Sequence, residues 1–281
     1  MPPSKRSGGW DGTYRRIDVH THSATFGAIT YRGSPAAYVK RIRQQGIDAI
    51  ALLGPGELCR KAVGKFGRDF IIPVPMYRLR ELPRRDLGGD MARWLDWGCK
   101  AIKFIAPLHP YSDERYWPLY QLVADRGALA VFHTGYLGFS GDAPEIPPVR
   151  MSDMRAAHVD TVGRRFPKLK ILMSHFSNPW WEEAWKVSWS RPNVYADLSG
   201  LTAARRSLNM WAETFAPNGR LMPESLGKLC FASDVTYLHN GRHEFAPYVE
   251  FYQKLLDRVS APQRLRQKIW SGNAKRLFGI R

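Results

Sequence analysis

Eight short apolar runs are spaced along the chain, and they restrict the fold more than any other feature. Between several of them apolar residues recur at helical spacing, as over residues 116–123 and 245–259. Strands that alternate with helices form βαβ units on a parallel sheet, and eight such units close into a barrel. We therefore expect an α/β fold, a (β/α)8 TIM barrel with strands at residues 17–19, 48–53, 70–74, 101–105, 129–132, 169–173, 194–198 and 229–232.

The first apolar run argues against the main alternative, an open doubly wound sheet. Such a sheet usually carries a Gly-rich phosphate-binding turn after its first strand, but here the run continues into His20, Thr21 and His22. A chain of 281 residues is typical of a barrel that forms a single domain. We expect residues 15–281 to form the barrel and residues 1–14, which are rich in Gly and charge, to form a flexible leader.

The composition places the chain among ordinary globular proteins, with 44% hydrophobic and 24% charged residues. No apolar stretch approaches the roughly 18 to 20 residues that cross a bilayer. Residues 1–14 have no apolar core of the signal-peptide kind, so we expect a cytoplasmic protein. The three cysteines are odd in number and none lies in a C-x-x-C spacing, which argues against a disulfide framework.

The formal net charge of +17 is the unusual number in the composition. A basic surface attracts anions, so an anionic substrate or an acidic partner, including nucleic acid, would suit it. The basic residues are scattered in pairs such as Arg15-Arg16 and Arg164-Arg165, which favours a solvated basic surface. We expect a small-molecule substrate, with an anion as one option, no membrane or nucleic-acid partner, and a homodimer as one option for assembly.

Two histidines end the first apolar run in the sequence Ile-Asp-Val-His-Thr-His. Residues i and i+2 of a strand point to the same side, so His20 and His22 can reach one ion. Neutral imidazole is a ligand for Zn²⁺ and related divalent metals, and carboxylates or thiolates usually complete the site. Because an H-x-H motif alone is weak evidence, the remaining ligands must come from elsewhere in the chain.

Three further apolar runs end in a residue of the same chemical kind. The fifth run leads into His133, the sixth into Ser174-His175, and the eighth into Ser233-Asp234. Barrel enzymes keep their catalytic groups at the ends of strands, where the loops begin. A single histidine in such a position is more often structural, but four positions of this kind in one chain favour a metal site.

These motifs together resemble the amidohydrolase superfamily. The resemblance is closer to the amidohydrolase-related branch, which includes aminocarboxymuconate semialdehyde decarboxylase, resorcylate-type decarboxylases and several lactonases. It rests on motifs in the order found in that branch: D-V-H-T-H at 18–22, A-I-K-F at 101–104, F-H-T-G at 132–135, S-H-F at 174–176, S-D at 233–234 and G-N-A-K-R-L-F at 272–278.

The resemblance implies a role for each of the strand-end residues. His20, His22, His133 and Asp234 match the metal ligands, while His175 matches a catalytic residue beside the metal. One divalent ion is implied, with Zn²⁺ preferred and Mn²⁺ as the alternative. Such an ion lowers the pKa of a bound water toward roughly 7. Asp234 would then act both as ligand and as base, and His175 would donate to a developing oxyanion or alkoxide.

Other residues are candidates for contact with the substrate. Lys103 lies in the fourth run, where some superfamily members carry a carboxylated lysine between two metals, but the A-I-K-F motif of the mononuclear branch favours a pocket lysine. Arg32 could bind an anion, and His109 could line the pocket or be a loop residue without a role. The Gly- and Pro-rich connection over 135–149 would serve as a lid or be a surface insertion.

Four functions are compatible with these residues. The first is a metal-dependent hydrolase that cleaves a C–O or C–N bond of a small lactone, ester or amide. The second is a metal-dependent non-oxidative decarboxylase of a small aromatic or unsaturated acid, which needs the same ligands. A nuclease of the TatD type is disfavoured because Lys103 stands in the fourth run and Ala232-Ser233-Asp234 at the eighth. A barrel that only binds its ligand is disfavoured because all five site residues are present.

Overall fold

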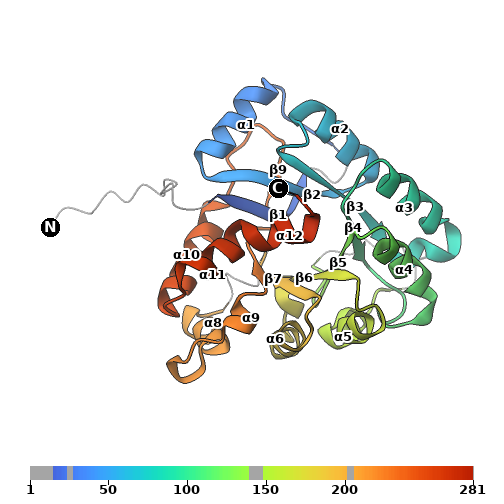
Figure 1. The fold of residues 1–281 in the computed structure, drawn as a ribbon. Coiled ribbons are helices and arrows are strands. Elements are labelled where there is room, and N and C mark those ends of the chain that lie inside the picture. The colour runs from blue at the N-terminus through green and yellow to red at the C-terminus, as the bar shows by residue number, and fades with distance from the viewer. Residues whose placement is uncertain (1–14, 24–27, 139–147, 201–205, 281) are drawn as a thin grey trace.

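The chain folds into a parallel β-barrel surrounded by helices, as the sequence predicts (Figure 1). The computed structural model describes residues 15–23, 28–138, 148–200 and 206–280. The leader predicted at 1–14 and the central part of the predicted lid lie outside these residues. Each of the eight predicted runs overlaps a strand. The strands are β1 Arg16–Ser23, β2 Ile47–Gly54, β3 Ile71–Arg78, β4 Ala101–Ile105, β5 Leu129–His133, β6 Lys170–Ser174, β7 Val194–Asp197, β8 Leu229–Cys230 and β9 Thr236–Tyr237.

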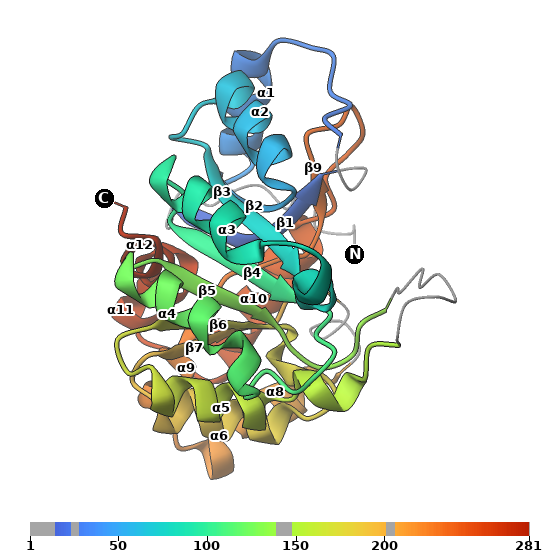
Figure 2. The same cartoon turned by 90° about the vertical axis from the view of Figure 1, so that its right-hand side faces the viewer.

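Helices follow the strands and cover the outside of the barrel (Figure 2). The periodicities at 116–123 and 245–259 correspond to the helices α4 and α10. The helices of the outer layer are α1 Pro35–Gln44, α2 Gly56–Phe66, α3 Leu87–Asp96, α4 Trp117–Asp125, α5 Ala156–Arg165, α6 Trp181–Ser190, α8 Leu208–Phe215, α9 Pro223–Leu226, α10 Ala246–Arg258, α11 Gln263–Gln267 and α12 Asn273–Phe278. None of the helices in the described part of the chain is both long and apolar enough to cross a membrane.

The eighth strand is interrupted, unlike the continuous run that the sequence predicts. Its first segment, β8, pairs with β7, and its second segment, β9, pairs with β1, so the same stretch of chain closes the ring of strands. Between the two segments the backbone of Asp234 adopts a positive φ of 65°. The carboxylate of Asp18 holds this bend, because it accepts hydrogen bonds from the Ser233 backbone N–H at 3.0 Å and from the Ser233 hydroxyl at 2.5 Å.

The two faces of the strands form two separate apolar layers. Residues that point away from the barrel axis pack against the helices in a large outer core. Residues that point toward the axis fill the inside of the barrel, where they repeat with the two-residue period of a strand. This inner core draws on every strand from β1 to β8: it contains Ile17, Val19, Ala49, Ala51, Leu53, Ile72, Val74, Ala101, Leu129, Val131, Leu172, Tyr195, Cys230 and Ala232.

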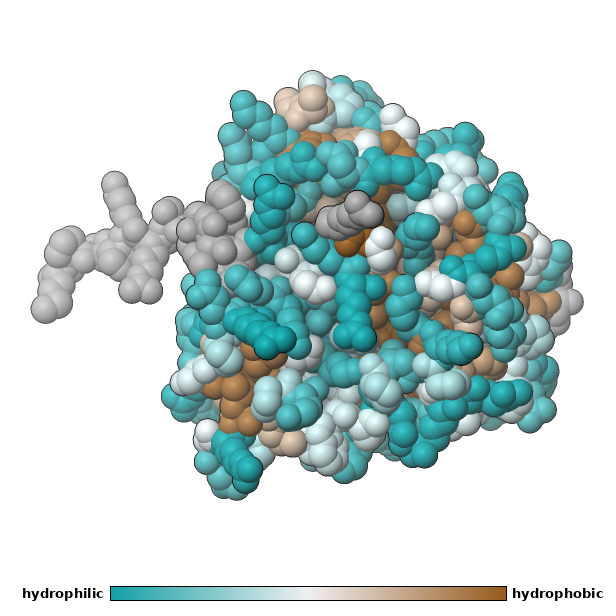
Figure 3. Space-filling model, in the orientation of Figure 1, coloured by the Kyte–Doolittle hydropathy of each residue, from teal (hydrophilic) through white to brown (hydrophobic). Residues whose placement is uncertain are grey.

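The C-terminal helix α12 closes the N-terminal end of the barrel. Its apolar residues Ala274, Leu277 and Phe278 belong to the inner core. The Asn273 side chain donates to the carbonyl oxygens of Gly227 at 2.9 Å and Leu229 at 2.7 Å, which fixes the helix beside β8. Figure 1 places α12 at the centre of this end, and hydrophilic side chains dominate the same view of the surface (Figure 3). The functional groups must therefore lie at the opposite end, where the strands finish.

The three cysteines are free and buried, in agreement with the expectation of no disulfide framework. Burial raises the pKa of the Cys59 thiol and of the Cys99 thiol to about 12. The thiols therefore stay protonated and serve as small apolar side chains of the core.

Shortening one buried side chain of α12 tests the role of this helix in closing the barrel. We expect Leu277→Ala to lower the free energy of unfolding by about 2–5 kcal/mol, because it leaves a cavity between the helix and the inner core. Urea denaturation followed by circular dichroism measures the loss. The matched control is Lys275→Ala on the exposed face of the same helix, which should change stability by less than about 0.5 kcal/mol. Equal effects of the two substitutions would contradict this role.

Candidate metal centre

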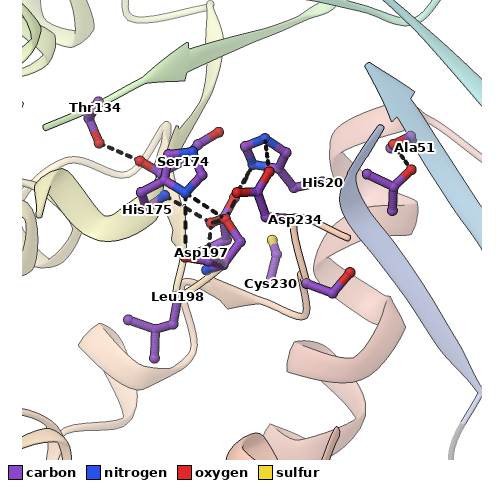
Figure 4. Close-up of polar contacts among 12 residues, drawn as sticks. His20, Ala51, Thr134, Ser174, His175, Asp197, Leu198, Cys230 and Asp234 are labelled. Atoms are coloured by element: carbon purple, nitrogen blue, oxygen red, sulfur yellow. Dashed lines mark hydrogen bonds and ion pairs between the residues drawn. The ribbon is translucent and has the colours of Figure 1, made fainter. Parts of the chain in front are cut away.

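A polar layer lies directly above the apolar interior of the barrel. Most of its members continue the inward-facing series of their strands, two residues beyond the last apolar position, as Asp197 does after Tyr195. In β1 the pairing with β2 shifts in register between Asp18 and Thr21, and His20 and His22 come to face the layer. The layer consists of His20, His22, Lys103, His133, Ser174, His175, Asp197, Ser199 and Asp234 (Figure 4 shows part of it).

Two histidines of β1 converge on the carboxylate of Asp234. Oδ1 of Asp234 lies 3.4 Å from Nε2 of His20 and 3.3 Å from Nε2 of His22. In a tetrahedral zinc site with bonds of 2.0–2.1 Å, neighbouring ligand atoms are separated by about 3.3 Å. His20 is buried, whereas 29% of the Asp234 side chain is exposed. Both separations from Asp234 therefore fit the ligand spacing of a divalent metal ion, and the carboxylate is open to solvent.

His175 also comes close to this group. One ligand atom each from His20, His175 and Asp234 lie within 4.8 Å of one another. The ring of His175 lies between two others, with centroids 4.7 Å from that of His20 and 4.7 Å from that of His133. His133 is outside the tight group, and its Nε2 lies 3.1 Å from the carbonyl oxygen of Tyr136. Both predicted histidines of β5 and β6 thus border the centre, with His175 the nearer one in this arrangement.

Burial and neighbouring charges favour neutral His20, His133 and His175 and an ionised Asp234. Burial and secondly the ammonium group of Lys103 hold the pKa of His20 well below its usual range. Burial also lowers the pKa of His133 and of His175. Burial alone would raise the pKa of Asp234, but the neighbouring His20, His175 and His22 bring it below its usual range. Neutral imidazole and ionised carboxylate are the forms that bind a metal ion.

Backbone carbonyl groups determine which ring nitrogen carries the proton in three of the histidines. A carbonyl oxygen only accepts, so the nitrogen that contacts it must be protonated. Nδ1 of His22 lies 3.2 Å from the oxygen of Leu53, and Nδ1 of His175 lies 3.4 Å from the oxygen of Ser199. In both rings the lone pair is then on Nε2. His133 differs, because Nε2 faces the carbonyl group and its lone pair is on Nδ1.

A glycine allows the loop after β7 to approach the centre closely. Gly200 has a positive φ of 65°, and its N–H donates to the carbonyl oxygen of Ser233 at 3.1 Å. A Cβ at this position would lie 2.8 Å from Oδ2 of Asp234 and 3.4 Å from Nδ1 of His175. Any larger residue would therefore displace the carboxylate or the imidazole.

Comparison with known proteins assigns the family. Residues 91–280 match the family model described as Amidohydrolase, which covers more than half of the chain. The chain belongs to the amidohydrolase family. The matched region contains His133, His175 and Asp234, while His20 and His22 precede it and are added by the geometry described above. The family resemblance seen in the motifs is thus confirmed, and the protein is a metal-dependent enzyme of the amidohydrolase superfamily.

Solved structures share the fold of this amidohydrolase at low sequence identity. An uncharacterized TIM-barrel protein from Bordetella bronchiseptica has 19% identity and a TM-score of 0.63, with 94% of this chain and 98% of that chain covered. A protein from Pseudomonas putida, provisionally described as a 2-pyrone-4,6-dicarboxylic acid hydrolase, has 17% identity and a TM-score of 0.58, with 94% and 97% covered. A 5-carboxyvanillate decarboxylase from Novosphingobium aromaticivorans, complexed with manganese, has 13% identity and a TM-score of 0.54, with 96% and 97% covered. A search of curated proteins gave no match.

The three predicted substrate contacts of this amidohydrolase lie in different surroundings. Lys103 belongs to the polar layer, where it is 1% exposed and its Nζ donates to the hydroxyl of Ser174 at 2.6 Å. Burial lowers the pKa of Lys103 to about 7, although Asp197 and Asp234 act against this shift. Arg32 is exposed, and its backbone N–H donates to the side chain of Asn240 at 3.3 Å. His109 is half-buried, and its Nε2 accepts a hydrogen bond from Arg115 at 2.6 Å.

Three buried polar residues of the centre were not among the predicted site residues. Asp197 is fully buried at the end of β7, and Ser199 follows it by two positions. Asp18, also buried, accepts from the backbone N–H of His20 at 3.3 Å, and burial raises its pKa to about 7. The signal for Asp197 was available, because a carboxylate at the end of an apolar run was the argument for Asp234. The sequence carried no such signal for Asp18 and Ser199, because their roles depend on contacts between strands that are distant in the sequence.

Metal analysis tests the centre directly. We expect about one divalent ion per purified chain, and a loss of most of it in Asp234→Ala, because this substitution removes the only carboxylate oxygen that both His20 and His22 face among the described residues. Inductively coupled plasma mass spectrometry gives the content. The control is Asp160→Asn, a partly exposed carboxylate paired with Arg164 and Arg191. Wild-type protein that holds no metal after incubation with Zn²⁺ or Mn²⁺ would refute the site, and two ions per chain would point to Lys103 as a bridge.

Proposed function

We propose that this amidohydrolase is a metal-dependent hydrolase that cleaves a C–O or C–N bond of a small carbonyl compound, such as a lactone, ester or amide. The observation that carries the proposal is the arrangement of Asp234. Its carboxylate faces two imidazole nitrogens at metal-ligand spacing, remains 29% exposed, and lies beside the partly exposed His175. Such a centre combines a place for an ion with two groups that can move a proton.

His20, His22, His133 and Asp234 would hold the divalent ion, with Zn²⁺ preferred and Mn²⁺ as the alternative. Three imidazoles and a carboxylate suit either metal, and manganese is the ion in one decarboxylase of similar fold. When bound, the ion would polarise the carbonyl group of the substrate and make water more acidic. The described side chains fit this group because Nε2 of His20 and Nε2 of His22 each lie at ligand spacing from Oδ1 of Asp234.

The solvent exposure of His133 and His175 supports different roles for the two residues. A residue that exchanges a proton with the substrate must be reachable, whereas a ligand can be buried. His133 is 7% exposed, and His175 is partly exposed at the end of β6. The backbone of His175, which has a positive φ of 64°, is held by a hydrogen bond of 3.0 Å from its N–H to Asp197. We therefore assign His175 to catalysis and His133 to the metal.

Asp234 and His175 share the movement of protons in this proposal. The carboxylate of Asp234 is ionised and accepts a proton from the attacking water. Nε2 of His175, which carries the lone pair of the neutral ring, then takes this proton from Asp234 and delivers it to the oxygen or nitrogen that leaves the carbonyl carbon. Lys103 is too buried for direct contact with a substrate, and we propose that its ammonium group acts from beneath through Ser174. Arg32 and His109 remain candidates for binding an anionic substrate from the surrounding loops.

Non-oxidative decarboxylation is the alternative function. It would use the same ligands, and a decarboxylase is among the proteins of similar fold. In that reaction the ion would hold the carboxylate of the substrate, and Asp234 would handle the proton. Nuclease activity of the TatD type is not proposed, because Lys103 occupies the fourth strand and Ser233-Asp234 follow Ala232 at the eighth. Homodimer assembly and a cytoplasmic location stay predictions from the sequence.

A pair of substitutions tests the roles of the two histidines. We expect His175→Asn to keep metal content near that of the wild type and to lower turnover by about 100-fold or more, because it removes a proton donor. His133→Asn should instead lose most of the metal. Metal analysis and steady-state kinetics of both variants are compared. Loss of metal in His175→Asn together with retention in His133→Asn would reverse the assignment.

Isotope labelling separates hydrolysis from decarboxylation. A panel of small lactones, p-nitrophenyl esters and anilides is incubated with the enzyme in ¹⁸O water, and hydroxybenzoic acids are incubated in parallel. Hydrolysis must place solvent oxygen in the product, because water attacks the carbonyl carbon. We therefore expect ¹⁸O in the acid product by mass spectrometry. Release of CO₂ from a hydroxybenzoic acid without incorporation of label would favour the alternative reaction.

A further inference from the structure

One hydroxyl group connects two histidines of the metal centre. The hydroxyl of Ser199 donates to Oδ1 of Asp197 at 2.5 Å, and its oxygen lies 3.3 Å from Nδ1 of His20 and 3.0 Å from Nδ1 of His175. A serine hydroxyl has one proton to donate and two lone pairs to accept with. Since the proton is committed to Asp197, both imidazoles must be the donors. Ser199 thus favours a proton on Nδ1 in each ring.

Asp197 fixes the orientation of this hydroxyl. It is fully buried, and its Oδ1 accepts from the backbone N–H groups of His175 and Ser199, each at 3.0 Å, besides the hydroxyl. Its other oxygen, Oδ2, lies 3.5 Å from Nδ1 of His20 and has no hydrogen-bond partner within the described part of the chain. A buried carboxylate oxygen of this kind is costly unless a donor faces it. The Nδ1–H group of His20 faces this oxygen and can donate to it (Figure 4).

His20 needs this arrangement more than the other histidines do. Carbonyl oxygens already define the protonated nitrogen of His22, His133 and His175. For His20 the contacts in the structure are Asp197 and Ser199 on the Nδ1 side and Asp234 on the Nε2 side. A proton on Nε2 would face Asp234 and occupy the direction in which a metal ion must bind.

We propose that Asp197 and Ser199 form a positioning pair that keeps the proton of His20 on Nδ1 and thereby leaves Nε2 available for the metal ion. The inference rests on the proposed metal site, and it assigns a role to two residues that touch neither ion nor substrate. The same pair orients the ring of His175, because Asp197 holds its backbone and Ser199 accepts from its Nδ1. Carboxylates that hydrogen-bond to a metal-binding histidine raise its basicity and restrict its rotation.

The substitution Asp197→Asn makes a defined change in this network. The single oxygen of the amide must stay where three donors meet Oδ1, so the NH₂ group takes the place of Oδ2 and points a proton at Nδ1 of His20. That nitrogen then has to accept, and the ring proton moves to Nε2. We expect the Kd for Zn²⁺, measured by competition with a chromogenic chelator, to rise about 10- to 100-fold.

Two controls separate positioning from a loss of stability. Asp160→Asn removes a carboxylate that pairs with Arg164 and Arg191 outside the centre, and its Kd for Zn²⁺ should stay within about twofold of the wild type. Ser199→Ala leaves Asp197 in place beside His20, so its effect on Zn²⁺ binding should be smaller than that of Asp197→Asn. Thermal unfolding of the metal-free proteins shows whether affinity merely follows stability.

The tautomer of His20 is read directly from the ¹⁵N shifts of its ring in metal-free protein, with His20→Asn to assign the signals. We expect the Nδ1–H form in the wild type and the Nε2–H form in Asp197→Asn. An Nε2–H form in the wild type overturns the proposal without need of a variant. An unchanged tautomer or an unchanged Kd in Asp197→Asn also overturns it. A tautomer that switches as expected in a protein that binds no Zn²⁺ would support the pair and refute the proposed metal function instead.

Discussion

The join between the first and the last strand of the barrel is the constraint on which the metal centre depends. The backbone N–H of Val19 donates to the carbonyl oxygen of Phe231 at 3.1 Å, and the N–H of Asp234 donates to the carbonyl oxygen of His20 at 2.8 Å. These bonds bring together residues that are more than two hundred positions apart in the sequence. Because β8 ends early and the chain bends at Asp234, the carboxylate turns inward toward the two histidines of β1. The closure of the fold and the assembly of the site are thus one event.

Many of the strands and site positions could be predicted because the side chains of a strand alternate between its two faces with a period of two residues. The inward-facing series of β5 and β8 run from apolar residues directly into His133 and Asp234, so their ends were recognisable as site positions. The same rule would have found Asp197 after Tyr195. It fails in β1, where the shift of register between Asp18 and Thr21 changes which residues face inward. It also fails for the interruption of the eighth strand, because the bond between Asp18 and Ser233 joins segments that no local pattern relates.

The polar layer above the inner core lowers the stability of the folded barrel. Below it lies the apolar inner core, and Lys103 and Asp197 of the layer, together with Asp18, are buried almost completely. Each of these groups would be strongly destabilising alone, since a buried charge or unpaired polar atom loses its hydration. Hydrogen bonds offset part of the loss, because Lys103 donates to the hydroxyl of Ser174 and Asp18 accepts from the hydroxyl of Ser233. The large apolar core between strands and helices provides the compensating stability.

A metal ion would remove the repulsion that remains between the histidine lone pairs and the carboxylate of Asp234. Its binding would therefore be coupled to folding. Without an ion, the lone pairs of His20 and His22 face the ionised carboxylate of Asp234 across 3.3–3.4 Å, an arrangement that is repulsive unless a proton or a cation lies between them. Burial disfavours the protonated imidazole of His20. A divalent cation at the proposed site would meet the same need with a larger charge, and it would bind only the folded chain because the three donors are assembled only when the barrel closes. Occupancy of the centre should therefore stabilise the junction of β1 with the eighth strand, the same junction that creates the centre.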